Sequence, residues 1–362
     1  MKGSLFLSHK NFFEKNHLNK FKNKYFENLI LKNNGIQFVF GDNNYFKIKY
    51  VNKTYLIFDK INFILLLKSI FIFSVKDYNL LKYIIKLYSY KPLRAKFDNN
   101  GYNNYFLLVF KVFFKSKYSY LFFKKNAHNF KTCFLNVHYS SVSIGALRAF
   151  NEINKQTIEL QHGYIGNSHP AYSKELFLNN NYIDFLPKKI IVWNKNFQNY
   201  VENVLGIESE ITGYKYIKNK IEFKRKYNHR VLYTLDWGAE IPEQIIKLMY
   251  DRKNIHWILR RHPRATKMFF NNKIILRIKN FQRNNIVFSD PKTPIEEELL
   301  KCDFHLTLES ATVHEAAALN THSYFYSNKH IKRFQFEIES NHATHIDERN
   351  LYKELSIILD KI

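Results

Sequence analysis

The sequence predicts an α/β protein made of two successive domains, each with a parallel sheet. From about residue 133 onward, short apolar runs with strand character alternate with segments of helical periodicity. The alternation breaks once, at the polar and highly charged segment 213–226, and then restarts. The 362 residues also exceed the roughly 250–300 that one hydrophobic core serves. We therefore expect an N-terminal domain at 1–212, a C-terminal domain at 213–345, and a C-terminal helix at 346–362 that packs back on the N-terminal domain.

Residues 1 to about 125 are rich in Phe, Tyr, Lys and Asn, and their strand and helix periods are poorly separated. The run LLVFKVFFKSKYSYLFFKK, residues 107–125, alternates aromatic and basic side chains. It fits either an edge strand and helix with solvated lysines, or a basic-aromatic face that rests on a membrane. The first interpretation is the more ordinary one.

Between residues 133 and 206 the pattern fits three strands and two helices. The first helix has its apolar residues on one face, and Ser140, Ser141 or Ser143 can serve as its N-cap. The second helix closes at Gly206. In order, the elements are strand CFLNVHY (133–139), helix SSVSIGALRAFNEINK (140–155), strand TIEL (157–160), strand KKIIVWN (188–194) and helix NFQNYVENVLG (196–206).

The second half repeats this plan after the linker. Strands alternate with helices at the spacing of a parallel sheet. The expected strands are HRVLYTLDWG (229–238), IHWILRRHP (255–263), NIVFSD (285–290), DFHLTLES (303–310) and THSYFYS (321–327), and the expected helices are 241–250, PIEEELLKC (294–302) and ATVHEAAALN (311–320).

Composition excludes several classes of protein. Two cysteines, Cys133 and Cys302, are too few for a disulfide framework or a thiolate zinc site, and they favour a reducing compartment. No histidine pair has a recognised metal-binding spacing. Neither a G-x-G-x-x-G fingerprint nor a Walker A loop is present, which counts against NAD(P) enzymes and P-loop ATPases. We therefore expect no metal and no cofactor.

The charge is strongly positive, with 56 Lys and Arg against 31 Asp and Glu, a net charge of +25. This potential favours an anionic partner such as nucleic acid, an acidic membrane surface or a phosphorylated substrate. Lys, Asn, Ile, Phe and Tyr are also the residues that AT-biased codons favour. Charge alone therefore does not identify the partner.

No segment has the roughly 20 apolar residues of a spanning helix. The best candidate, INFILLLKSIFIFSV (61–75), carries Lys68 in its middle and is too short, so a buried helix or strand pair is expected there. The N-terminal residues lack the sustained apolar core of a signal peptide. We expect a cytoplasmic protein that lies against the inner face of the membrane.

Open α/β sheets bind ligands just beyond the carboxyl ends of their strands. The first polar cluster at such an end is Gln161-His162-Gly163-Tyr164. His162 can act as a general base toward an acceptor hydroxyl, and Gly163 permits a tight turn with close backbone approach. A structural histidine bonded to a carbonyl fits position 162 equally well. His169 and Tyr172, slightly downstream, are expected to line the same loop.

The second cluster is Arg260-Arg261-His262-Pro263-Arg264, directly after the apolar residues of a strand. Arginine guanidinium groups match the geometry of phosphate oxygens. A basic run more often marks a solvated face, but the position of this one at a strand end favours an anion site.

The third cluster is the segment ESATVHEA, residues 309–316. Ser310 or Thr312 is expected to cap a helix, and their hydroxyls with the free backbone amides would form a phosphate cradle. Glu315 falls in the first helical turn, where an ordinary capping role is as probable on local grounds. The occurrence of this cluster in one domain with the arginine cluster favours function.

Four segments, in chain order, resemble bacterial GT-B glycosyltransferases of capsule and lipopolysaccharide assembly, over roughly residues 133–345. His-Pro followed by a Ser/Thr-bearing helix start is similar to the pairing in bacterial sialyltransferases and Kdo transferases, which use CMP-sugars. A similar His-Pro element occurs in CDP-glycerol glycerophosphotransferases of teichoic acid synthesis. The segments are ELQHGYIGNSHPAY (159–172), IIVWNKNF (190–197), RRHPR (260–264) and LTLESATVHEAAALNTHSYFYS (306–327).

The resemblance implies two Rossmann-like domains facing across a cleft, with the acceptor over the first and the nucleotide-sugar over the second. It implies that His262 and Pro263 contact the nucleotide, Ser310 and Thr312 its phosphate, and that Glu315 lies near the ribose. The bacterial sialyltransferases have an acidic-acidic-Gly motif where this chain has Gln-His-Gly. The catalytic base is therefore His162, or a carboxylate such as Glu159 or Asp236.

The leading prediction is a metal-independent glycosyltransferase that moves a sugar from a nucleotide-activated donor to a surface glycan or lipid-linked acceptor. His162 would deprotonate the acceptor. Positive charge would stabilise the departing phosphate, and it would hold the enzyme near anionic lipid. The residues predicted at the phosphate are Arg261, His262, Arg264, Ser310 and Thr312, and those on the acceptor side are Gln161, Gly163, Tyr164 and His169.

Three alternatives remain. A CDP-polyol phosphotransferase of the same fold is the nearest. A nucleotide-sugar 2-epimerase would need several carboxylates that converge, which the sequence does not show. A basic nucleic-acid-binding protein would carry a binding module, and no RRM, KH or helix-turn-helix signature is present, so no nucleic-acid partner is expected.

Overall fold

The computed structural model shows two compact units, residues 1–213 and 214–362. The boundary lies one residue from the one expected. Each unit is built on its own sheet of parallel strands, which confirms the predicted pair of α/β domains. The residues that the structure describes are 3–9, 13–15, 21–23, 30, 36–40, 54–56, 73–89, 102–167, 169–212, 229–236, 240–261, 285–289 and 293–361.

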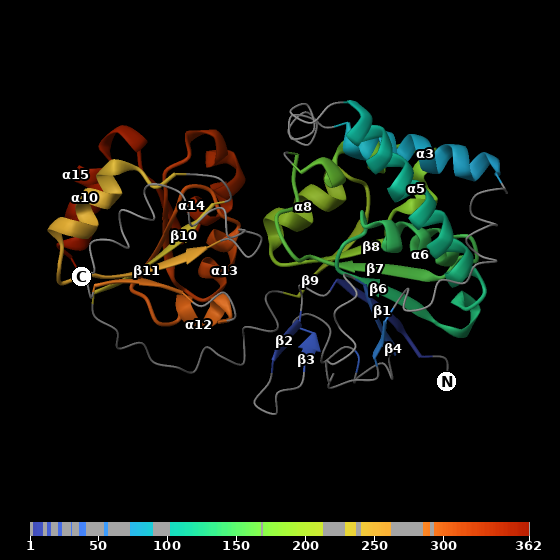
Figure 1. The fold of residues 1–362 in the computed structure, drawn as a ribbon, viewed down its shortest axis with the longest axis horizontal. Helices are drawn as coiled ribbons and strands as arrows, with labels where there is room; N and C mark the ends of the chain where they lie inside the picture. The colour runs from blue at the N-terminus through green and yellow to red at the C-terminus, as the bar shows by residue number, and fades with distance from the viewer. Residues whose placement is uncertain are drawn as a thin grey trace. The chain divides into compact units, whose positions relative to one another are not determined.

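The first unit contains a seven-stranded sheet within the described residues, with the order β5-β4-β1-β6-β7-β8-β9 and all neighbours parallel (Figure 1). The chain order reverses direction between β1 and β6, so this is the point where a crevice opens at the carboxyl edge of such a sheet. The strands are β1 (Leu5–His9), β4 (Ile36–Phe40), β5 (Thr54–Leu56), β6 (Thr132–Leu135), β7 (Gln156–Leu160), β8 (Lys189–Val192) and β9 (Glu208–Ile211); β2 (Phe13–Lys15) and β3 (Phe21–Asn23) form a separate antiparallel ribbon.

Alternation along β1 divides the first core in two. Leu5 and Leu7 pack with buried residues of helices α5 and α6, whereas Phe6 faces the other side and stacks on Phe134 at 4.8 Å between ring centroids. Both faces of this sheet are therefore buried, as parallel sheets require. The helices and 3-10 turns of the unit are α3 (Val75–Tyr88), α5 (Tyr102–Lys124), η2 (Ala127–Asn129), α6 (Ser141–Asn151), η3 (Pro170–Tyr172), α7 (Lys174–Phe177), η4 (Asn180–Phe185) and α8 (Lys195–Asn203).

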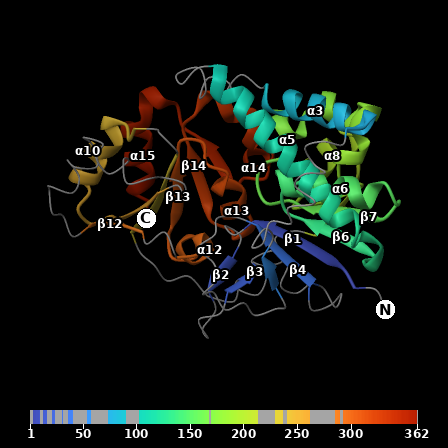
Figure 2. The ribbon, with the colours of Figure 1, turned by 45° about the vertical axis from the view of Figure 1, so that its right-hand side comes forward.

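Helices α3, α5 and α6 lie side by side on one face of the first sheet (Figures 1 and 2). Helix α6 starts at Ser140, whose hydroxyl accepts from the Ser143 amide, as one of the expected caps. Helix α5 passes so close to α6 that a Cβ at Gly145 would lie 2.3 Å from the Ser116 carbonyl oxygen. The glycine is thus required by the close approach of two backbones.

The second unit contains a six-stranded parallel sheet within the described residues, with the order β12-β11-β10-β13-β14-β15. Numbered within the unit, this is 3-2-1-4-5-6, the order typical of dinucleotide-binding sheets. The order reverses between β10 and β13. The strands are β10 (Arg230–Leu235), β11 (His256–Arg261), β12 (Ile286–Phe288), β13 (Phe304–Thr307), β14 (His322–Phe325) and β15 (Ala343–His345).

The C-terminal helix α15 (Leu351–Leu359) belongs to the second unit. Its buried residues Leu351, Leu355 and Leu359 join the core that holds Trp257, and it packs beside α10 (Glu243–Asp251). The buried face of α15 thus contributes to the core of its own unit, and the expected packing of this helix on the N-terminal domain stays a prediction. The other helical elements are α12 (Ile295–Leu299), α13 (Thr312–Ala318), η6 (Asn328–Phe334), α14 (Gln335–Glu339) and η7 (Glu348–Asn350).

Two expected elements differ in the structure. Residues 107–124 continue a single helix, so the expected edge strand there is wrong. Strand β6 ends at Leu135, and residues 136–139 form the turn into α6. The expected linker, 213–226, and most of the apolar run 61–75 lie outside the described residues. Among the helices that the structure describes, none combines the length and the apolar character that crossing a membrane demands.

We expect the substitution Gly145→Ala to lower the free energy of unfolding by about 3 kcal/mol or more. The added Cβ would clash with backbone atoms of α5, which cannot move aside as a flexible side chain could. Urea unfolding of the variant measures the loss. Gly163→Ala is the matched control, since a Cβ there meets nothing within 4 Å. Equal stability of the two variants would contradict the close α5–α6 packing.

Candidate functional site

A network of polar groups occupies the carboxyl edge of the second sheet where its strand order reverses. Asp236 follows β10, and its Oδ2 accepts from the Thr307 hydroxyl at 3.1 Å and from the Glu309 amide at 3.1 Å, both at the end of β13. The Thr307 hydroxyl in turn accepts from the Ser310 amide at 3.2 Å. The turn after β13 is therefore fastened to the end of β10, at the place where open α/β sheets bind ligands.

Burial raises the pKa of Asp236, although the bonds from Glu309 and Thr307 and the charge of Arg333 act in the opposite direction. Arg333 comes from η6, after β14, and its Nη1 donates to the Glu309 carbonyl at 3.2 Å. This arginine was not among the predicted residues, because it lies far along the chain from any motif. Its position in the segment that follows the predicted strand 321–327 could have identified it as a residue near the carboxyl edge of the sheet.

Arg261 ends β11 at the same edge, paired in register with Leu235. Burial lowers its pKa. Because β10 lies between β11 and β13, Arg261 is two strands from the Ser310 turn, about 10 Å away. Arg260 is used structurally, since it bonds Glu298 and Ser289 within the unit. The predicted residues His262, Pro263 and Arg264 lie outside the described residues.

The start of α13 does not offer the free amides that the sequence predicted. The Ser310 hydroxyl accepts from the Thr312 amide at 3.3 Å and lies 3.0 Å from the Thr312 hydroxyl oxygen. The amides of Val313 and His314 donate to the carbonyls of Ser310 and Ala311. The amides of Thr312, Val313 and His314 are thus already engaged within the turn. The bond between the Ser310 and Thr312 hydroxyls uses one of their two protons, which leaves the other for a ligand. Glu315 lies half-buried in the first turn, as expected.

The interior of this sheet keeps a neutral polar link just inside the edge. His305 on β13 bonds the Thr234 hydroxyl at 2.8 Å and the Ser323 hydroxyl at 2.9 Å. Burial lowers the pKa of His305 to about 3, so the ring is neutral at pH 7. This link joins β10, β13 and β14 and holds the three loops of the site in fixed positions.

At the carboxyl edge of the first sheet a buried carboxylate organises the loops. Glu159 on β7 accepts from the His138 amide at 3.0 Å and from the Tyr172 hydroxyl at 3.1 Å, and its Oε2 lies 2.8 Å from His138 Nδ1. Glu159 is fully buried. These contacts are all with internal groups, so Glu159 holds the surrounding loops in position, and its role as the alternative base stays a prediction.

Three half-buried rings gather above that carboxylate. The Tyr139 hydroxyl oxygen lies 3.3 Å from His162 Nε2, and the Tyr139 ring centroid lies 5.2 Å from that of His169. The structure therefore brings the predicted residues His162 and His169 together, around a tyrosine that the sequence analysis had placed inside a strand. Gly163, next to His162, borders open space. This glycine is not required by the packing of the described chain.

Two predicted acceptor-side residues have structural roles. Gln161 is buried. Its side-chain Nε2 donates to the Gly163 carbonyl at 2.9 Å, and its Oε1 accepts from the Trp193 backbone amide at 2.8 Å. Tyr164 folds over Gly166 and meets the ring of Phe197 edge-on. Both side chains brace the turn that presents His162, because their polar or aromatic groups are already engaged.

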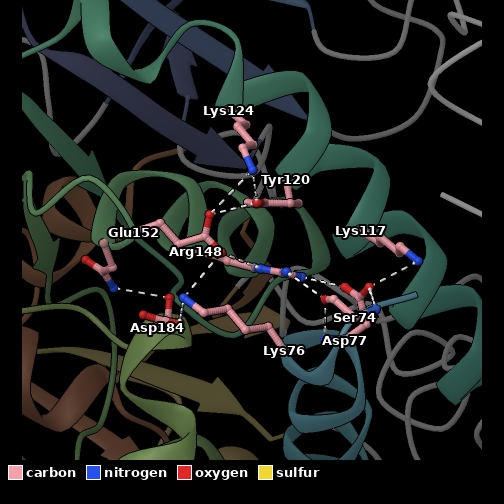
Figure 3. Close-up of polar contacts among 10 residues, drawn as sticks. Ser74, Lys76, Asp77, Lys117, Tyr120, Lys124, Arg148, Glu152 and Asp184 are labelled. Atoms are coloured by element: carbon pink, nitrogen blue, oxygen red, sulfur yellow. Dashed lines mark hydrogen bonds and ion pairs between the residues drawn. The ribbon is translucent and has the colours of Figure 1, made fainter. Parts of the chain in front are cut away.

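A separate cavity of about 630 Å³ opens among helices α3, α5 and α6. Arg148 lines it, and Figure 3 shows this side chain between two carboxylates: it bonds Asp77 at 2.6 Å and Glu152 at 3.1 Å. Lys117 lies 3.3 Å from Asp77, and both are buried. Cations and carboxylates pair throughout this cavity, so we interpret it as an ion-pair network that joins the three helices.

The carboxylates of the network hold their charge strongly. Burial alone would raise the pKa of Asp77, but the hydrogen bond and charge of Arg148 and the bond from Ser74 outweigh it and leave the pKa below its ordinary value of 3.8. The contribution of Asp77 to stability is therefore present above about pH 4 and is lost as the pH falls through the lowered pKa.

We expect Asp77→Asn to cost about 3–5 kcal/mol at pH 7, because it leaves two buried cations without a full countercharge. The gap to the wild type should shrink as the pH falls below 4. Urea unfolding at several pH values measures both effects. Asp184→Asn is the control, since it removes a partner of the half-exposed Lys76 and should cost less than about 1 kcal/mol. Equal losses, or a gap independent of pH, would contradict the network.

Comparison with known proteins supports the fold. No family model and no curated protein matches the chain. Among solved structures, the UDP-GlcNAc 2-epimerase of Methanocaldococcus jannaschii has a TM-score of 0.56 at 12% identity, covering 100% of this chain and 92% of that one. The wall teichoic acid polymerase TagF has a TM-score of 0.51 at 12% identity, covering 100% and 80%.

A third similar structure is MurG of Acinetobacter baumannii, with a TM-score of 0.50 at 9% identity, covering 99% of this chain and 91% of that one. At such identities the likeness concerns the fold alone. Two parallel α/β units with these strand orders, similar over their whole length to three such structures, show that the chain has the GT-B fold.

Proposed function

We propose that the protein is a glycosyltransferase that uses a nucleotide-activated sugar, with CMP-linked donors favoured, and that it acts on a glycan or lipid-linked acceptor of the cell surface. The observation that carries this proposal is the polar turn at the strand-order reversal of the second sheet, where Asp236, Thr307 and Ser310 are joined. The fold is shared with a UDP-GlcNAc 2-epimerase and with a wall teichoic acid polymerase. This likeness supports a nucleotide-activated substrate.

The donor phosphate would bind at this turn. The hydroxyls of Ser310 and Thr312 would donate to phosphate oxygens, and Arg261 and Arg333 would supply positive charge from either side. Asp236 would hold the turn in shape. Beyond these, the proposal keeps Glu315 near the ribose and His262, Pro263 and Arg264 at the nucleotide.

The acceptor would bind beside His162 and the open space at Gly163, with His169 and Tyr164 bordering it. The acceptor hydroxyl oxygen attacks the anomeric carbon of the sugar, and its proton passes to the His162 imidazole. The bond from the anomeric carbon to the phosphate oxygen breaks, and its electron pair leaves with the nucleotide. Tyr139, at 3.3 Å from the imidazole, would orient the ring. The proposed reaction needs no metal or cofactor.

A nucleotide-sugar 2-epimerase is the second candidate, because several of the similar structures are epimerases. It would be expected to gather several acidic groups at its reaction centre. Among the described carboxylates at the edge of the first sheet, Glu159 is fully engaged with His138 and Tyr172. A CDP-polyol phosphotransferase remains the nearest alternative in donor chemistry. We propose a cytoplasmic enzyme on the inner membrane face, without a nucleic-acid partner.

A thermal-shift series with CMP, CDP, UDP, GDP and ADP tests the donor site. We expect one nucleotide to stabilise the wild type by about 2.7 kcal/mol at a hundredfold excess over its Kd. Ser310→Ala should weaken that nucleotide roughly tenfold, the worth of one charge-assisted hydrogen bond. Ser356→Ala on α15 is the matched control. If no nucleotide stabilises the protein, or both variants respond like the wild type, the proposed donor site is wrong.

Replacement of His162 tests the proposed base. His162→Asn should lower kcat by about 10²–10⁴ and leave nucleotide affinity unchanged, because the imidazole acts on the acceptor proton. The exposed His128→Asn is the control. Product analysis with the preferred nucleotide-sugar separates the candidates: free nucleotide plus glycosylated acceptor supports transfer, whereas an epimerised nucleotide-sugar without acceptor supports the epimerase. Full activity of His162→Asn would exclude this residue as the base.

A further inference from the structure

We propose that the outer face of helices α3 and α5 docks the protein on an anionic lipid bilayer. Large apolar side chains on this face are between 42% and 79% exposed. We define them as the α3/α5 apolar surface: Phe73, Val75, Tyr78, Ile85, Phe106, Leu107 and Phe110. The biological purpose of this surface rests on the proposed function, because a lipid-linked acceptor would lie at a membrane. The test of the surface does not depend on that function.

The surface is continuous between the two helices. On α5 the ring of Phe106 contacts Phe110 at 6.1 Å between centroids, and Phe110 contacts Phe114 at 6.2 Å. Phe114 then meets Phe113, which stacks on Phe73 at the start of α3. At the other end the Tyr105 hydroxyl donates to the Ile85 carbonyl, which ties the start of α5 to the last turns of α3.

On α3 and α5, the exposed charged side chains that the structure describes are all lysines. Exposed lysines stand at positions 82 and 86 of α3 and at 111 and 115 of α5. Asp77 is the only acidic residue in the sequence of α3, and it is buried, whereas α5 contains no Asp or Glu. Apolar side chains among lysines, without exposed carboxylates, complement the acyl chains and the anionic headgroups of a bilayer. An apolar protein partner alone would not require this charge.

The two helices are also held rigidly, so the surface is formed before it meets a membrane. Lys117 of α5 and Arg148 of α6 share Asp77 of α3 (Figure 3), and Lys76 bonds Asp184 at 2.7 Å. These ion pairs face the interior of the helical layer. They fix the first turn of α3, which carries Val75 and Tyr78. Docking therefore does not have to order this turn, and the entropic cost of binding is lower.

The face also offers an explanation for the composition of α5. A helix that is apolar on all sides is normally buried or spans a membrane. The second half of α5 is buried against the first sheet and α6, with Tyr120 and Phe123 in the core. Its first half carries Phe106, Leu107 and Phe110 into solvent. A bilayer surface covers that half without requiring the helix to cross the membrane.

Vesicle co-sedimentation of the full chain tests this proposal. We expect the wild type to bind phosphatidylcholine vesicles that contain phosphatidylserine, to bind pure phosphatidylcholine much more weakly, and to lose binding as salt is raised. The double variant Phe106→Ser/Phe110→Ser should bind at least about tenfold more weakly, because it removes inserted aromatic area. The triple variant Lys82→Gln/Lys86→Gln/Lys111→Gln should lose on the order of a hundredfold, at about fivefold per lysine.

The matched controls lie in the second unit. Lys253→Gln/Lys301→Gln/Lys353→Gln removes the same charge from exposed sites, and Ile357→Ser removes an exposed apolar side chain. Both should bind like the wild type. Equal losses in the two lysine triples would show general charge attraction and overturn the proposal. A Phe106/Phe110-dependent dimer without vesicle binding would assign the face to a second copy, and absence of binding to anionic vesicles would reject it.

The thermal shift of each variant with the preferred nucleotide separates this surface from the proposed function. If a surface variant loses vesicle binding but is still stabilised normally by the nucleotide, the α3/α5 apolar surface acts in docking and not in nucleotide binding. Vesicle binding without any nucleotide response would retain the surface and reject the proposed enzyme.

Discussion

The fastening of the turn after β13 to the end of β10 is the contact on which the site of the second unit depends. Asp236 directly follows β10 and Thr307 ends the neighbouring strand β13, at the point where the strand order reverses. Their bond fixes the backbone of Glu309 and hence the position of the Ser310 hydroxyl. A sheet in which β10 and β13 were not neighbours would separate these two groups.

The first unit solves a similar problem with a buried carboxylate. Glu159 binds the loop after β6 through His138 and the turn of η3 through Tyr172, so two loops far apart in the sequence are held over one strand end. The rings of Tyr139 and His169 come together as a result. A buried carboxyl group is costly unless hydrogen bonds satisfy it, and here these bonds also position two loops.

The sequence was informative where period and position suffice. Strand and helix alternation after residue 133 identified the two sheets, and the ends of strands located His162, Arg261 and Ser310 at carboxyl edges. It failed where the answer depends on contacts between distant segments. Arg333 and Tyr139 carry no local motif, and the amides at α13 donate within a turn three residues long.

The most direct test of the account is a crystal structure of the chain with the nucleotide that stabilises it best. The account predicts phosphate density within hydrogen-bond distance of the hydroxyls of Ser310 and Thr312, with Arg333 or Arg261 beside it. Density for the same nucleotide against a different strand edge, with the Asp236–Thr307 turn unoccupied, would contradict it.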